Sequence, residues 1–144
     1  MLKYILTAVG GITVGFIAGI FFEKLLKKLE EKRIIESTKL LVECFGEPMY
    51  SSTFNIEDVT TWVEGIKDKL VDGNKVAVIR TSKKLIEKYC NNIHISQDIE
   101  NYLIMTIVSS NQEMNESILV KFDNLDPKLS DLLDKGDGIL IVED

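Results

Sequence analysis

The sequence has little of the chemistry on which most catalytic centres depend. It contains one histidine and two cysteines, and no G-x-S-x-G motif frames a nucleophilic serine. Cys44 and Cys90 lie 46 residues apart without the spacing of zinc ligands. His94 follows Cys90 by four residues, but Asn91 and Asn92 interrupt the helix that would place both on one face. We therefore expect no catalytic residue, no metal site, no cofactor, and two reduced thiols.

Positive charge is scarce after the first quarter of the chain. The net charge of −6 divides into +3 over residues 1–33 and −9 over residues 34–144. A segment this acidic repels the phosphates of nucleic acids and anionic lipid headgroups. We therefore expect no nucleic-acid partner, and the charge favours a basic or neutral protein partner.

Charge is absent altogether from residues 4–22, a run of nineteen residues with the sequence YILTAVGGITVGFIAGIFF. As a helix this run would reach roughly 28 Å, close to the ~30 Å hydrocarbon thickness of a bilayer. Only Lys3 precedes it, and it ends in two phenylalanines rather than in the small residues of a signal-peptide cleavage site. The run predicts an uncleaved transmembrane anchor with the lipid bilayer as its partner.

Basic residues flank the run mainly on its carboxyl side. They are Lys24, Lys27, Lys28, Lys32 and Arg33. Because Lys and Arg resist translocation, this asymmetry predicts a single-pass protein of the cell membrane with its amino terminus outside. The chain would then divide into an anchor (1–22), a basic juxtamembrane helix (23–33) and a cytoplasmic domain (34–144).

Three glycines in the run, Gly11, Gly15 and Gly19, form two overlapping G-x-x-x-G units. Such a face lets a second helix approach closely, which predicts a homo-oligomer or pairing with another membrane protein. The alternative is that glycine is simply common in membrane helices.

Hydrophobic periodicity in residues 34–144 predicts an α+β domain. Helices are expected over 34–45 and 56–71, separated by a turn-rich connection, with Asn55 as the N-cap of the second. From residue 75 the expected order is β-α-β-β-α-β, with strands at 75–80, 102–109, 118–122 and 139–142 and helices at 83–90 and 126–134. This order is typical of a ferredoxin-like fold, whose two helices lie on one face of the sheet. The two preceding helices would cover the other face; another α+β layout or a parallel α/β sheet are the alternatives.

One basic turn joins the first of these strands to a helix, and it consists of Arg80, Thr81, Ser82, Lys83 and Lys84. Its hydroxyls, cations and backbone N–H groups suit a phosphate or carboxylate. The turn lacks the glycines with which a P-loop wraps a nucleotide, so the simpler interpretation is a capped helix with a solvated basic turn. A solvated acidic face is expected near the end of the chain, from Asp123, Asp126, Asp131, Asp134, Asp137, Glu143 and Asp144.

Together these patterns predict a single-pass membrane protein whose acidic domain is a protein-binding or scaffolding module rather than an enzyme. The alternative is a sensor or enzyme for a small anion bound at residues 80–84.

Overall fold

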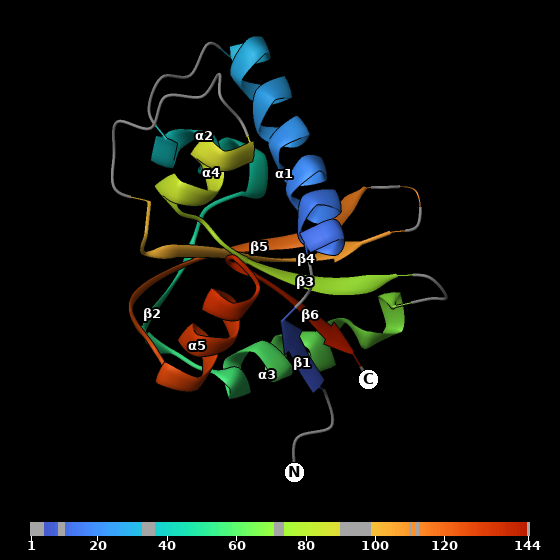
Figure 1. Ribbon diagram of the computed structural model, residues 1–144, viewed down its shortest axis with the longest axis vertical. Coiled ribbons are helices and arrows are strands. Elements are labelled where there is room, and N and C mark those ends of the chain that lie inside the picture. Colours follow the sequence, from blue (N-terminus) through green and yellow to red (C-terminus); the bar gives the residue numbers. More distant parts are fainter. Residues whose placement is uncertain are drawn as a thin grey trace.

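A computed structural model gives a mixed α/β fold and describes residues 5–8, 11–32, 37–70, 74–89, 99–109, 111 and 113–143 (Figure 1). Within these ranges the strands are β1 (Ile5–Ala8), β2 (Met49–Phe54), β3 (Lys75–Arg80), β4 (Tyr102–Val108), β5 (Met114–Leu125) and β6 (Ile139–Glu143). The helices are α1 (Gly11–Lys32), α2 (Ser37–Phe45), α3 (Ile56–Ile66), α4 (Lys83–Tyr89) and α5 (Pro127–Lys135), and a short 3₁₀ helix, η1 (Lys67–Lys69), follows α3.

The six strands form one sheet in the order β1-β6-β3-β4-β5-β2. β2 pairs with β5 in parallel, and the other neighbours are antiparallel. The central strands are apolar on both sides because both sides are buried: Val76 and Val78 of β3 point to one face, and Ala77 and Ile79 to the other.

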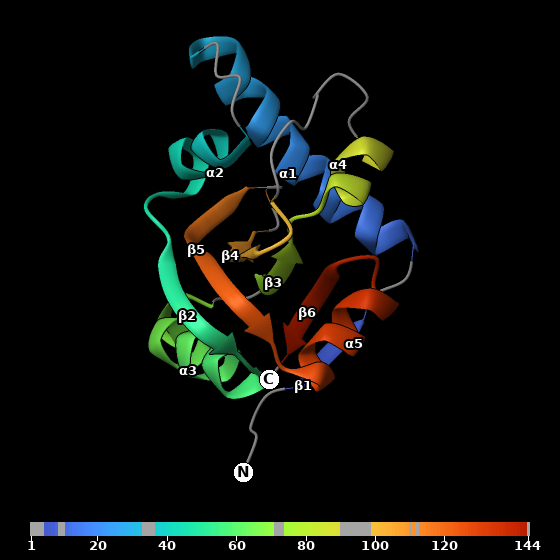
Figure 2. The same cartoon turned by 90° about the vertical axis from the view of Figure 1, so that its left-hand side faces the viewer.

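Helices cover both faces of the sheet (Figures 1 and 2). On the face that we call the α1 face, α1, α2 and α4 pack on strand residues Ala77, Ile79, Ile104, Val108, Leu119, Ile139 and Ile141. On the opposite face, the α3 face, α3 and α5 pack on Val76, Val78, Leu103, Met105, Ile107, Val120, Phe122, Leu140 and Val142. The result is a three-layer arrangement with a separate apolar core on each side of the sheet.

The prediction of a transmembrane anchor over residues 4–22 is wrong. Within the described ranges, no helix combines the length and the apolar character needed to cross a bilayer. The run is divided between two elements, because residues 5–8 form β1 at the edge of the sheet and α1 begins only at Gly11. The uncharged part of α1 is residues 11–22, which as a helix spans roughly 18 Å against the ~30 Å of a bilayer core.

Instead, one side of α1 is part of the protein core. Its buried residues recur once per helical turn, as two adjacent pairs and a single residue, and lie in the α1-face core: Ile17, Ala18, Phe21, Phe22 and Leu25. The Phe21 ring is stacked on the Phe45 ring of α2, with 5.7 Å between centroids. α1 continues without a break past residue 22 into a charged segment, so the buried stripe crosses the expected boundary between anchor and juxtamembrane helix. The predictions of a single-pass anchor and of a location in the cell membrane, which depended on this run crossing the bilayer, are therefore wrong as well.

The ferredoxin-like topology is also wrong, although the elements from Lys75 onward follow one another as β-α-β-β-α-β. In that fold the two strands joined by a helix are parallel and have another strand between them. Here β3 and β4 are direct antiparallel neighbours, with Ala77 opposite Thr106. α4 and α5 lie on opposite faces of the sheet, and so do α2 and α3. Because the sheet is apolar on both faces, helices must pack against both, and α1 forms much of the layer on the α1 face.

The two edge strands lie where no strand was expected. β1 comes from the apolar run, and β2 lies within the stretch 46–55 that reads as a turn-rich connection. The adjoining helix α3 begins as predicted, because Asn55 accepts a hydrogen bond from the Asp58 backbone N–H at 2.9 Å and the Asp58 carboxylate accepts one from the Asn55 N–H. The predicted N-cap is therefore confirmed.

The glycine face of α1 is open in the structure. A Cβ atom built on Gly15 or Gly19 would meet no other atom within 4 Å, and the neighbouring Phe16 side chain is exposed. Gly11 is the first residue of α1. Association of α1 with a second helix through these glycines stays a prediction.

Candidate functional site

The residues of the basic turn have different roles in the structure. Thr81 is buried, and its hydroxyl donates a hydrogen bond to the Ile99 carbonyl, so it holds the end of β3 against the chain entering β4. The Ser82 hydroxyl accepts a hydrogen bond from the Leu85 N–H at 3.0 Å and caps α4. Lys83 belongs to α4, but its side chain is outside the described part of the structure. Arg80, Ser82 and Lys84 therefore remain as groups that can meet a ligand.

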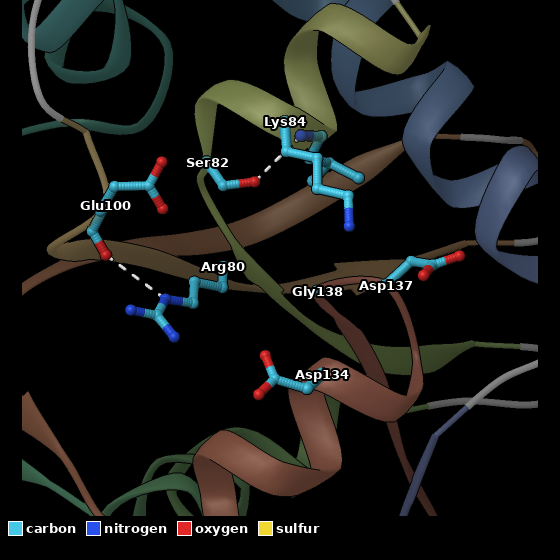
Figure 3. A pocket seen from close by; sticks show the side chains of 8 residues that line it. Arg80, Ser82, Lys84, Glu100, Asp134, Asp137 and Gly138 are labelled. Atoms are coloured by element: carbon cyan, nitrogen blue, oxygen red, sulfur yellow. Dashed lines mark hydrogen bonds between the residues drawn. The ribbon is translucent and has the colours of Figure 1, made fainter.

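These three residues line a pocket of about 270 Å³, together with Leu85, Glu100, Asp134, Asp137 and Gly138 (Figure 3). The pocket lies where β3 ends and where β4 and β6 begin. From these neighbouring strand ends the chain turns to opposite faces of the sheet, because α4 belongs to the α1 face and α5 to the α3 face.

A tight turn between α5 and β6 forms one wall of the pocket. Asp137 has φ +54° and Gly138 has φ +95°. The Gly138 carbonyl accepts a hydrogen bond from the Arg80 N–H at 2.8 Å, and a Cβ at position 138 would lie 3.4 Å from the Arg80 carbonyl oxygen. Both the positive φ and this close approach favour glycine there. The turn places the Asp137 side chain beside the end of β3.

Arg80 is held in place by two contacts. Its Nε donates a hydrogen bond to the Glu100 carbonyl oxygen at 3.3 Å, and its guanidinium carbon lies 5.7 Å from the centroid of the Phe122 ring. Neither contact uses the terminal Nη groups, which carry four of the five N–H donors of the guanidinium. The arrangement therefore orients the side chain and leaves its fork geometry for a planar anionic group.

Sequence reasoning did not connect the carboxylates of the pocket with the basic turn. Asp134 and Asp137 come from a segment interpreted as a solvated acidic face, and Glu100 precedes β4. About fifty residues separate Asp134 from Lys84, so only the fold brings them together. The glycines at positions 136 and 138, which mark the turn, were the available signal. Three carboxylates beside two cations make the pocket of mixed charge rather than purely basic.

Among the described residues, the remaining chemistry-bearing side chains form no second centre. Cys44 is a free thiol, and burial raises its pKa to about 11 against the opposing effect of Lys24 and Lys28. A thiol with this pKa is protonated at neutral pH and is a poor nucleophile. Cys90 and His94 lie outside the described residues. Over the parts of the chain that the structure describes, no group of three or more His, Cys, Asp or Glu residues is placed to hold a metal ion.

Comparison of the chain with protein-family models, with curated proteins and with solved structures gave no match in any of the three.

Proposed function

We propose that the protein is a small-molecule-binding module and that the pocket between α4 and α5 is its ligand site. The observation that carries this proposal is the convergence of polar side chains from four separate segments on one cavity. These segments are the end of β3, the start of α4, the turn that precedes β4, and the end of α5 with its following turn. A few convergent polar groups in a concave site are typical of small-molecule sites.

The size of the pocket favours a metabolite rather than a macromolecule. Its volume of about 270 Å³ lies just below the range of roughly 300–1,000 Å³ common for ligand pockets. Leu85 gives it an apolar surface, and Arg80 gives it an oriented charge. A small polar compound with a short carbon skeleton fits both features.

A second hollow, of about 310 Å³, lies between α1 and the start of β5 and is more open to solvent. Glu23, Lys24, Lys27 and Glu113 are among its lining residues. Because this hollow is the more open of the two and its charged lining residues come from α1 and from the start of β5 alone, we assign the ligand to the pocket at β3.

The proposal is tested by NMR titration of the ¹⁵N-labelled full chain with amino acids, organic acids, amines and sugars. At least one class should shift the amide signals of Arg80, Ser82 and Gly138 in a saturable way. Asp134→Asn should change the affinity for that class, whereas Asp68→Asn, which replaces an exposed aspartate of η1, should not. If no class shifts these amides, or if both variants behave alike, the proposed function is wrong.

A further inference from the structure

We infer that the pocket selects a zwitterion of the amino-acid class, with the ligand carboxylate at Arg80 and the ligand ammonium at Asp134. This inference rests on the proposed function and adds the chemical class of the ligand. It starts from the distribution of charge around the cavity, which carries two cations and three carboxylates.

The charged residues come from both helix layers and from the sheet between them. The Arg80 side chain lies over Phe122 on the α3 face, the face to which α5 with Asp134 belongs, whereas Lys84 stands in α4 on the α1 face. In Figure 3 the Lys84 side chain extends from α4 toward the side of the pocket where Asp134 and Asp137 lie. A bound molecule in this cavity therefore meets cations and carboxylates together.

Within the described ranges, neither Lys84 nor Asp134 forms an ion pair. The ion pairs found among the described residues join Lys67 to Glu64, Lys69 to Glu116 and Lys75 to Glu143, and none includes Lys84 or Asp134. Arg80 uses Nε for its hydrogen bond to a backbone carbonyl. Each end of a zwitterion thus finds a group of opposite charge that need not first give up an internal ion pair.

Ligands with a single charge fit the pocket less well. An organic anion attracted to Arg80 meets the repulsion of Asp134, Asp137 and Glu100, and an amine attracted to Asp134 meets that of Arg80 and Lys84. Selectivity of this kind depends on repulsion of the wrong ligand as much as on attraction of the right one. A molecule that carries both charges can place its carboxylate at the cations of the pocket and its ammonium at the carboxylates.

Three compounds with the same five-carbon chain separate these cases: 5-aminopentanoate, pentanoate and pentylamine. Their affinities for the full-length protein are measured by NMR titration at low ionic strength, following the amides of Arg80, Ser82 and Gly138. We expect 5-aminopentanoate to bind at least about tenfold more tightly than either analogue, which corresponds to a loss of one charge contact in each.

Variants assign the two ends of the ligand. Asp134→Asn should reduce the affinity for 5-aminopentanoate by about tenfold, so that the ratio of its affinity to that of pentanoate becomes smaller. Lys84→Gln should make the ratio of the affinity of 5-aminopentanoate to that of pentylamine smaller. Asp68→Asn and Lys39→Gln, which remove the same charges from exposed positions in η1 and α2, should leave all three affinities unchanged.

The outcomes distinguish the two proposals. If pentanoate or pentylamine binds the pocket as tightly as 5-aminopentanoate, the zwitterion inference is overturned while the proposed function stands. The same holds if none of the three binds but another class of compound shifts the pocket amides. If no compound of any class shifts them, both proposals fail.

Discussion

The two faces of the sheet are covered by helices whose sequences differ in kind. On the α3 face, α3 and α5 are amphipathic, and their buried residues Val59, Val63, Leu129 and Leu133 recur four apart among polar neighbours. On the α1 face, the first half of α1 has no charged residue on any side, yet among its described side chains, those of residues 15–22, only one side of the helix is buried. The difference teaches that periodicity identifies a core helix only where its exposed side is polar. A uniformly apolar sequence segment is equally consistent with a helix that packs in a protein core and with one that crosses a membrane.

Removal of the Phe21 ring should have the largest effect on stability. Phe21 is fully buried between Phe22, at a centroid distance of 5.1 Å, and Phe45. Phe21→Ala should lower the free energy of unfolding by about 3–5 kcal/mol, because it removes buried apolar surface and leaves a cavity. The loss of unfolding free energy is measured by urea unfolding. The fluorescence of Trp62 follows the transition, and because Trp62 lies on the α3 face, it reports the effect on the side of the sheet opposite Phe21.

Phe16→Ala is the matched control, because Phe16 stands on the same helix with 47% of its surface exposed. It should cost about 1 kcal/mol or less. If Phe21→Ala and Phe16→Ala both cost only about 1 kcal/mol of unfolding free energy, α1 does not form part of the α1-face core.

Leu133→Ala probes the α3 face and should cost about 2–5 kcal/mol, since Leu133 is fully buried in α5. Trp62 fluorescence and the circular dichroism of the whole chain should then report a single transition, because both cores share one sheet. Asp131→Ala, an exposed position of the same helix, should change the midpoint little. Two separate transitions would show that the faces unfold independently.

Gly19→Ala should stabilise the protein by about 0.5–1 kcal/mol, because Gly19 is inside a helix and an added Cβ meets no atom within 4 Å. Thermal unfolding measures the gain. Gly138→Ala is the contrasting substitution and should destabilise, because residue 138 has φ +95°. A loss of stability in Gly19→Ala, or a shift to a smaller species in analytical ultracentrifugation, would instead show that the glycine face is covered by a second chain.

The smallest effect on stability is expected from Cys44, which packs at the α1-face core. Its folded pKa of about 11 lies above the ordinary value of 9.0, so between these pH values the unfolded chain loses a proton that the folded chain keeps. Stability from this thiol is therefore present below about pH 9 and falls as the pH rises toward 11. The thiol is only partly buried, which makes the decline small.

The decline is measured by urea unfolding at pH 8 and pH 10 in a Cys90→Ser background, with and without Cys44→Ala. The chain that keeps Cys44 should lose more stability between the two pH values than the chain without it. Parallel losses would show that burial does not hold the thiol protonated.

Much of the centre of the fold is predictable from the sequence, and its edges are not. β3 and β4 read as buried strands because they are apolar on both sides, and α3 is recognisable from its periodicity and from Asn55. β1 and β2 form by pairing with strands more than sixty residues away, Ile5 with Glu143 and Met49 with Val120, so no local pattern marks them. Long-range pairing also decides the topology.

The candidate site divides in the same way. The basic turn at residues 80–84 is visible in the sequence because it is contiguous and follows a strand. The carboxylates opposite it are not, because α5 and the turn at Asp137 reach Arg80 only through the pairing of β6 with β3. The sequence therefore offered an anion site only as the alternative to a capped helix with a solvated basic turn, and the fold adds carboxylates to the same pocket.

The central claim is that the apolar first half of α1 is a layer of the folded protein, and the contact between the Phe21 and Phe45 rings tests it most directly. The two ring centroids lie 5.7 Å apart and the ring planes differ by 14°. In the NMR spectrum of the full chain in detergent-free buffer, nuclear Overhauser cross-peaks should connect the protons of these two rings. Their absence, with rapid local motion of the α1 amides, would contradict the account.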